Sequence, residues 1–120
     1  MDISKVKRQN EKEAEEFIIS GKDFVMQRVS SPPHKVVRLN FPQTLVYHSP
    51  TGMDWGYAGS GPSETALNIL FLCTGNQELS MLHHQAFKWK FITGIPEEGG
   101  TIKRADVIAW LDKEMAGEGA

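Results

Sequence analysis

The sequence predicts an α+β fold, in which a short antiparallel sheet packs against two or three helices and an accessory helix precedes them. Three observations support this prediction: segments with apolar residues at helical spacing, short runs of β-favouring residues between them, and Gly- or Pro-rich borders. The 120 residues fit one domain, and the content of 40% hydrophobic and 23% charged residues is ordinary for a globular protein. We divide the chain into an accessory segment at 1–33, a compact domain at 34–116 and a flexible tail at 117–120.

The first helix is expected to begin after Asn10, whose side chain suits an N-cap, and Glu13 occupies the position of a capping-box acid. Its apolar face includes Phe17, and Gly21 suits its C-terminal end. The tetrapeptide Ser-Ser-Pro-Pro at 30–33 then interrupts regular structure, because proline cannot continue a helix. This interruption sets the boundary between the accessory segment and the compact domain.

Two β-rich segments follow at 36–39 and 44–47, and Asn-Phe-Pro-Gln at 40–43 separates them, which predicts a hairpin. The next helix is predicted to start at Pro62, which suits the first helical position, and to end at Gly75. The residues between them leave little polar face, so we expect this helix to be largely buried.

Residues 77–86 predict a second, shorter helix. Its expected inward side chains are Leu79, Leu82 and Ala86. Phe-Lys-Trp-Lys-Phe at 87–91 alternates apolar and charged residues, which predicts a half-buried strand with its rings inward and its lysines outward. A final helix is predicted over 104–115. Its expected inward stripe consists of Val107, Trp110, Leu111 and Met115.

The charge balance, 13 Lys and Arg against 15 Asp and Glu, disfavours nucleic-acid or membrane binding driven by overall charge. The alternation at 87–91 also disfavours single-strand binding, because it separates the rings from the lysines. The N-terminal residues lack the apolar region of a signal peptide, and no apolar run approaches the ~20 residues that span a bilayer. We therefore expect a cytoplasmic protein without a membrane or nucleic-acid partner.

Neither a metal site nor a reactive thiol is predicted. Cys73, the single cysteine, lies in an apolar run and is expected to be buried and inert. The adjacent His83 and His84 would point about 100° apart on a helix. His34 and His48 have no carboxylate at a useful spacing. We expect no metal ion and no cofactor.

The glycine-rich segment 54–64, Asp-Trp-Gly-Tyr-Ala-Gly-Ser-Gly-Pro-Ser-Glu, allows a structural and a binding interpretation. Its glycines can turn the chain into the buried helix, or amides at the helix start can hold an anion, although the spacing matches no dinucleotide or P-loop pattern. Glycines flank Ser60 directly, unlike the G-x-S-x-G pattern of a hydrolase nucleophile, so Ser60 is expected in a turn. Nothing in the sequence shows that His48 and Asp54 converge on it.

Trp-Gly-Tyr-Ala-Gly-Ser-Gly-Pro at 55–62, followed by an apolar helix, resembles an uncharacterised family of small bacterial and phage proteins. Phe-Lys-Trp at 87–89, Ile-Pro at 95–96 and Trp-Leu at 110–111 extend this resemblance over roughly 36–112. The resemblance implies a compact fold and a phage or mobile-element setting, with no known chemistry.

These observations favour a non-enzymatic interaction protein of phage or mobile-element type, which binds a host or phage protein and modulates a host system. Tyr and Trp are frequent interface anchors. The expected contact residues are therefore Asp54, Trp55, Tyr57 and Ser60. The alternative is a small anion- or nucleotide-binding protein or enzyme. Its expected ligand-binding residues are Gly59, Gly61, Ser63 and Glu64.

Overall fold

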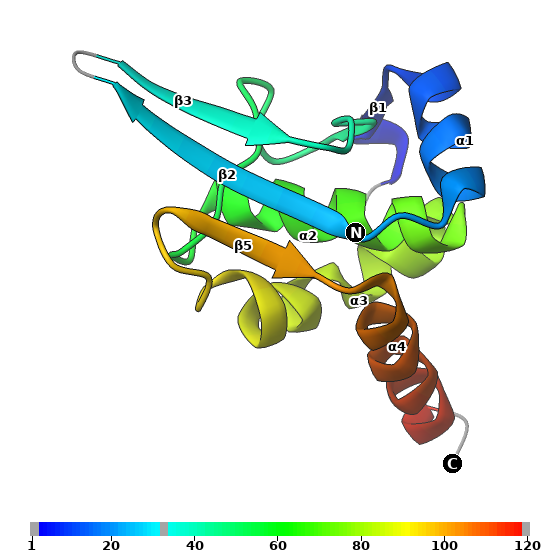
Figure 1. Ribbon diagram of the computed structural model, residues 1–120. Coiled ribbons are helices and arrows are strands. Elements are labelled where there is room, and N and C mark those ends of the chain that lie inside the picture. The colour runs from blue at the N-terminus through cyan, green and yellow to red at the C-terminus, as the bar shows by residue number, and fades with distance from the viewer. Residues whose placement is uncertain (1–2, 32–33, 119–120) are drawn as a thin grey trace.

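A computed structural model describes residues 3–31 and 34–118 and has the predicted α+β class. Two small antiparallel sheets combine with four α-helices (Figure 1). The N-terminal elements are η1 (Ile3–Lys5), β1 (Lys7–Arg8), α1 (Glu11–Ser20), β2 (Phe24–Ser31), β3 (His34–Leu39) and β4 (Leu45–Val46). The C-terminal elements are α2 (Ser60–Thr74), α3 (Gln77–Phe87), η2 (Lys88–Ile92), β5 (Gly99–Ile102) and α4 (Arg104–Glu118).

The larger sheet has the order β3-β2-β5, and the smaller one pairs β1 with β4. The hairpin predicted between 36–39 and 44–47 is therefore wrong, because these two segments belong to different sheets. Asn40 explains the separation: its side chain accepts a hydrogen bond from Val25 N (2.8 Å) and donates one to Asp23 O (2.9 Å). These bonds hold the end of β3 against β2, and the chain then leaves the sheet instead of turning back.

Helix α2 is the buried centre of the molecule, as the sequence predicts. Every residue from 61 to 72 is buried. The helix begins at Ser60, two residues earlier than expected, and Gly59 is its N-cap. Gly75 ends it in a left-handed conformation (φ 67°), where its N–H donates to Phe71 O at 2.7 Å.

Helix α1 and strand β2 belong to the same hydrophobic core as α2. Phe24 lies 5.3 Å from Phe17 of α1 and 5.2 Å from Phe41, measured between ring centroids. Packing therefore connects the predicted accessory segment with the residues that follow it. Asn10 precedes α1 as predicted, but its side chain makes no capping hydrogen bond and donates to Gln43 O instead.

The segment 87–91 is not a strand, which corrects the sequence prediction. It continues α3 into the five-residue π-helix η2. Phe87 and Phe91 stack with centroids 4.6 Å apart, and both contact Trp110 of α4. Apolar residues four apart suit a helical turn as well as a strand, so the alternation in the sequence was ambiguous. Trp89, expected inward, is 63% exposed.

The inward faces of α3 and α4 also differ from the predicted ones. On α3, Leu82 and Ala86 are exposed. The buried residues of this helix are Ser80, Met81, His83, His84 and Phe87. On α4, Val107 and Leu111 are buried as predicted, whereas Met115 is 43% exposed. In Figure 1, the C-terminal part of α4 extends away from the rest of the molecule.

Two predicted segments lie partly outside the described residues. Pro32 and Pro33 of the predicted interruption are not described, and neither are residues 119–120 of the predicted tail. Gly117 and Glu118, the other tail residues, are the last residues of α4. No helix among the described residues combines the length and the apolar character that crossing a membrane requires.

Candidate functional site

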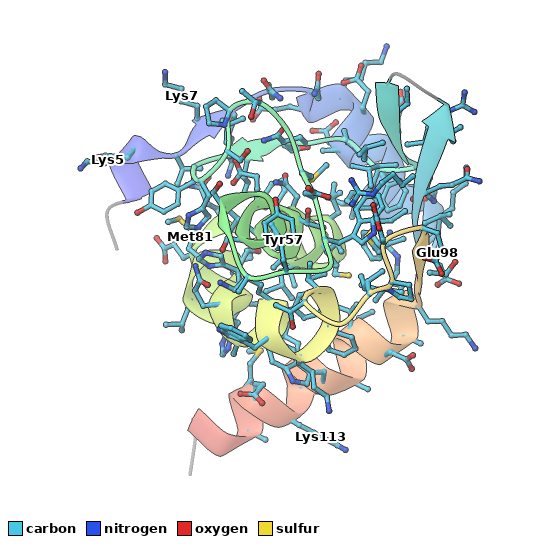
Figure 2. All side chains as sticks on the ribbon, turned by 90° about the vertical axis from the view of Figure 1, so that its left-hand side faces the viewer. Lys5, Lys7, Tyr57, Met81, Glu98 and Lys113 are labelled. Atoms are coloured by element: carbon cyan, nitrogen blue, oxygen red, sulfur yellow. The ribbon has the colours of Figure 1, made fainter. Side chains whose placement is uncertain are left out.

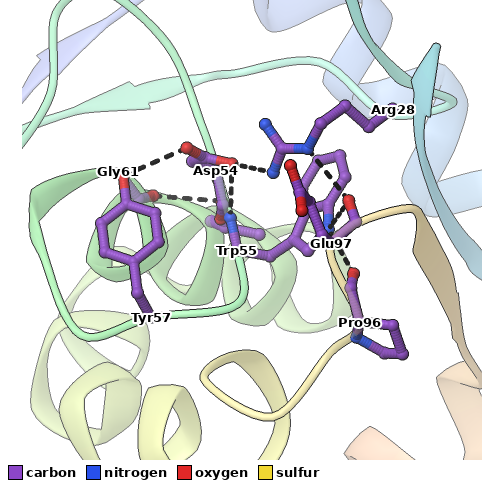
Figure 3. A network of polar contacts seen from close by, with 8 residues as sticks. Arg28, Asp54, Trp55, Tyr57, Gly61, Pro96 and Glu97 are labelled. Carbon is purple, nitrogen blue, oxygen red and sulfur yellow. Dashed lines mark hydrogen bonds and ion pairs between the residues drawn. The ribbon is translucent and has the colours of Figure 1, made fainter. Parts of the chain in front are cut away.

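The glycine-rich loop before α2 is fixed by a buried tryptophan. The Trp55 side chain is 1% exposed, and its indole N–H donates to the carbonyl oxygens of Pro96 (2.9 Å) and Glu97 (3.2 Å) (Figure 3). The guanidinium of Arg28 lies 4.6 Å above the indole ring and donates to Glu97 O at 2.9 Å. The loop, the chain before β5 and strand β2 therefore meet at this indole.

Asp54 is the polar centre of the same site. Its Oδ1 accepts hydrogen bonds from Arg28 Nη2 at 2.7 Å and from Trp55 N at 2.9 Å, while its Oδ2 accepts from Tyr57 Oη at 3.1 Å. Its backbone connects to α2, because Thr65 Oγ1 donates to Asp54 O at 2.6 Å. The ion pair with Arg28 is partly buried, which makes it less screened by solvent than an exposed pair.

Arg28 is a site residue that the sequence analysis missed. It precedes Asp54 by 26 residues, so no local motif connects the two. The available signal was its position in β2, two residues after the buried Met26 and four after the buried Phe24. Alternation in a strand places these three side chains on one face. An arginine on a face that points inward needs an acidic partner, because a buried charge without one is destabilising.

The glycines allow the loop to approach α2 closely. Gly56 has a positive φ of 87°, and its N–H donates to Ile92 O at 3.1 Å. A Cβ at Gly59 would meet the Tyr57 ring at 2.7 Å, and one at Gly61 would meet the Asp54 Cβ at 2.8 Å. These contacts support the structural interpretation, in which small residues let the loop fold over the start of the helix.

The surface of this loop carries Tyr57 and Ser60. Tyr57 is 50% exposed, and Ser60 is exposed as well. Figure 2 shows Tyr57 in the middle of one face of the molecule, in front of α2. Burial of part of the ring and the hydrogen bond to Asp54 raise the pKa of Tyr57 above its usual value. Of the four predicted contact residues, Trp55 alone is inside the molecule, where it supports the loop.

The residues of the alternative anion site are mostly enclosed. Gly61, Ser63 and Glu64 are buried, and Gly59 is partly buried. The N–H of Ser63 donates to Gly59 O at 3.0 Å. The side chain of Glu64 is already engaged. Its carboxylate accepts hydrogen bonds from three consecutive backbone N–H groups at 47–49, and it therefore occupies the cluster of amides in the loop after β4.

The residues considered for a catalytic triad have other partners. Asp54 binds Arg28 and Tyr57, whereas His48 Nε2 lies 2.7 Å from His84 Nε2. Burial lowers the pKa of both imidazoles, that of His84 to about 4. Within the described ranges, no three His, Cys, Asp or Glu side chains are grouped so that they could hold a metal ion. Burial raises the pKa of Cys73 to about 11, which favours the unreactive thiol.

A family model described as "Family of unknown function (DUF6166)" matches residues 19–113. This match covers most of the chain, and the protein belongs to that family. The match begins within α1 and includes β2, so it extends further toward the N-terminus than the resemblance seen in the sequence. Neither a curated protein nor a solved structure shows significant similarity to the chain.

Proposed function

We propose that this protein is a non-enzymatic interaction protein, encoded by a phage or mobile element, that binds a host or phage protein and modulates a host system. Tyr57 and Ser60 form the contact surface, and Asp54 orients the Tyr57 hydroxyl. The observation that carries the proposal is a half-exposed tyrosine on a loop that internal bonds hold in place.

Preorganisation is the physical reason for choosing this surface. Tyrosine provides a large contact area and a polar end, and it is among the residues most enriched at the energetic centres of interfaces. The bond to Asp54 and the close approach of the ring to Gly59 restrict the Tyr57 side chain before binding. Immobilising a side chain on binding costs about 0.5–1.5 kcal/mol. Because the Tyr57 ring is already held in place, the complex avoids part of this cost.

The function test compares Tyr57→Ala with Trp89→Ala. Both rings are exposed, at 50% and 63%, but Trp89 lies on η2 and outside the loop, so it is a matched control. We expect Tyr57→Ala to weaken the complex with the partner at least tenfold, and Trp89→Ala to leave it within twofold. The partner is first obtained by photo-crosslinking in host cells from position 58, an exposed neighbour of Tyr57 that leaves this side chain in place, and affinities are then measured with the purified pair.

Equal affinity of wild type and Tyr57→Ala would contradict the proposal, as would crosslinking from position 89 alone. Far-UV circular dichroism and thermal unfolding of each variant establish that it is folded. Trp55→Ala is unsuitable for this test, because it removes a buried side chain and would disturb the whole loop. A thermal-shift screen with nucleotides and phosphate addresses the alternative binding function, and we expect no shift from either.

A further inference from the structure

His48 and His84 face each other although 36 residues separate them. His48 lies on the loop after β4 and is partly buried, whereas His84 lies on α3 and is 1% exposed. His84 Nδ1 is 2.7 Å from Met81 O. A carbonyl oxygen can only accept, so His84 Nδ1 carries the proton, and the neutral ring presents an unprotonated Nε2 to His48.

Two donors meet this single nitrogen. His48 Nε2 lies 2.7 Å from His84 Nε2, and Gln85 Nε2 lies 3.3 Å from the same atom. An imidazole nitrogen without a proton has one lone pair, in the plane of the ring. Hydrogen bonding therefore satisfies one donor well and the other poorly. Gln85 follows His84 directly on α3, but its longer side chain brings its amide to within 3.3 Å of His84 Nε2, so three side chains converge on one position.

We propose that His48, His84 and Gln85 form a binding site for a divalent transition-metal ion of the zinc class. Each imidazole contributes Nε2, the commonest metal ligand in proteins. His48 becomes a ligand when its proton resides on Nδ1, so the ring stays neutral and no proton is gained or lost. A rotation of the Gln85 amide presents Oε1, because the oxygen and nitrogen ends of an amide have the same shape. Water completes the coordination.

The distances are close to those that a tetrahedral ion requires. With bonds of about 2.0–2.1 Å, two ligand atoms lie about 3.3 Å apart. The separation between His84 and Gln85 is already 3.3 Å, and that between His48 and His84 would increase from 2.7 Å. The His48 backbone is held by its N–H bond to Glu64, so this increase requires rotation of the partly exposed His48 side chain. The bond from His84 Nδ1 to Met81 O is the outer contact that metal-bound histidines typically make.

Access and charge also permit a cation. Gln85 is exposed and His48 is partly exposed, so solvent reaches one side of the site and can supply the water ligand. The charged groups whose electrostatic influence reaches the rings are Glu64 of α2, which favours a cation, and Lys88 of η2, which opposes it. Because these opposite charges offset each other, the affinity for a cation depends mainly on the ligand atoms.

The test uses the full chain, without a purification tag and after treatment with a chelator. Isothermal titration with Zn²⁺ and absorption spectra with Co²⁺ measure affinity and coordination. We expect one ion per chain, with at least tenfold weaker binding in His48→Ala. Gln85→Glu should bind at least tenfold more tightly than wild type, because a carboxylate replaces the neutral amide oxygen. His34→Ala, which changes a histidine of β3, serves as the control and should bind within twofold of wild type.

Gln85 is exposed, so its substitution tests the site even if a histidine variant fails to fold. Wild-type protein that binds no Zn²⁺ would overturn the proposal. Equal Zn²⁺ affinity in wild type, His48→Ala and Gln85→Glu would also overturn it, because the ion would then bind elsewhere on the chain.

Discussion

Arg104, at the start of α4, connects the ends of two other helices. Its guanidinium donates to Phe17 O in the last turn of α1 (3.2 Å) and to Leu72 O in the last turn of α2 (2.8 Å). It also lies 5.3 Å from the Phe17 ring centroid and 5.2 Å from that of Phe24. The positive charge therefore satisfies helix-terminal carbonyls and contacts two core rings.

Arg104→Ala is expected to lower the free energy of unfolding by about 3 kcal/mol, because partly buried carbonyls lose charged donors and the rings lose their contact. Arg104→Lys should recover less than half of this loss, since one ammonium cannot reproduce the fork of the guanidinium. Urea unfolding measures both variants. Arg38→Ala, which changes an exposed arginine of β3, is the control and should change stability by less than about 0.5 kcal/mol. Similar losses for Arg38→Ala and Arg104→Ala would contradict this role.

Single residues also show why only part of the candidate site could be predicted. The prediction that Asp54 and Tyr57 contact a partner was based on their place in a distinctive glycine-rich segment. Their partner Arg28, and the pairing of His48 with His84, depend on how strands and helices meet in space. No spacing within one segment encodes such a contact. The burial of Trp55 was equally undetermined, because an aromatic residue in a loop can face either way.

Helix α2 organises the chain before it through two buried polar side chains one turn apart. Asn68 Oδ1 accepts from the N–H groups of Thr44 (2.7 Å) and Leu45 (2.8 Å), and its Nδ2 donates to Leu45 O at 2.9 Å. Glu64 accepts from the N–H groups of 47–49. These side chains supply hydrogen-bond partners to a partly buried segment that forms only a two-residue strand, β4.

Asn68→Leu is expected to destabilise the protein by about 3 kcal/mol or more, because it leaves buried backbone groups at 44–45 without partners. Asn68→Asp keeps an acceptor for the N–H groups at 44–45, but near neutral pH it should lose at least as much, because it replaces the donor to Leu45 O and Glu64 O with a buried negative charge. Hydrogen exchange locates the effect: amides at 44–49 should exchange faster, while those of α3 change only with global stability. Uniform exchange changes in Asn68→Leu would argue against a local role for this side chain.

Sequence patterns determine some elements of this fold and leave others open. Helix α2 was predicted because a long apolar run lies between two clear helix-terminal signals, Pro62 at its start and Gly75 at its end. The strand predicted at 87–91 failed because Phe87 and Phe91, four residues apart, satisfy the helical and the alternating pattern alike. The hairpin failed because strand pairing depends on partners distant in the chain, here β1 and β2.

In the whole molecule, α1 and β2 contribute to the hydrophobic core and β2 to the larger sheet, so these elements are not peripheral additions. Strand β2 is the central strand of the larger sheet and pairs with both β3 and β5. Phe17, Phe24 and Met26 are core residues. The sequence suggested a boundary at 30–33 because two prolines interrupt the pattern there, but β2 and β3, on either side of these prolines, pair with each other.

A chain that begins at residue 34 is therefore expected not to fold cooperatively. It would lack β2, so β3 and β5 would have no partner, and the core would lose Phe24 and Met26. A chain that ends at residue 116 is the matched control, because residues 112–117 are exposed, and it should keep the wild-type melting transition. Circular dichroism melting and two-dimensional NMR compare the two chains. A cooperative melt and a dispersed spectrum for residues 34–120 would show that the segment 1–33 is dispensable, and the packing of β2 would then contribute far less than its central position implies.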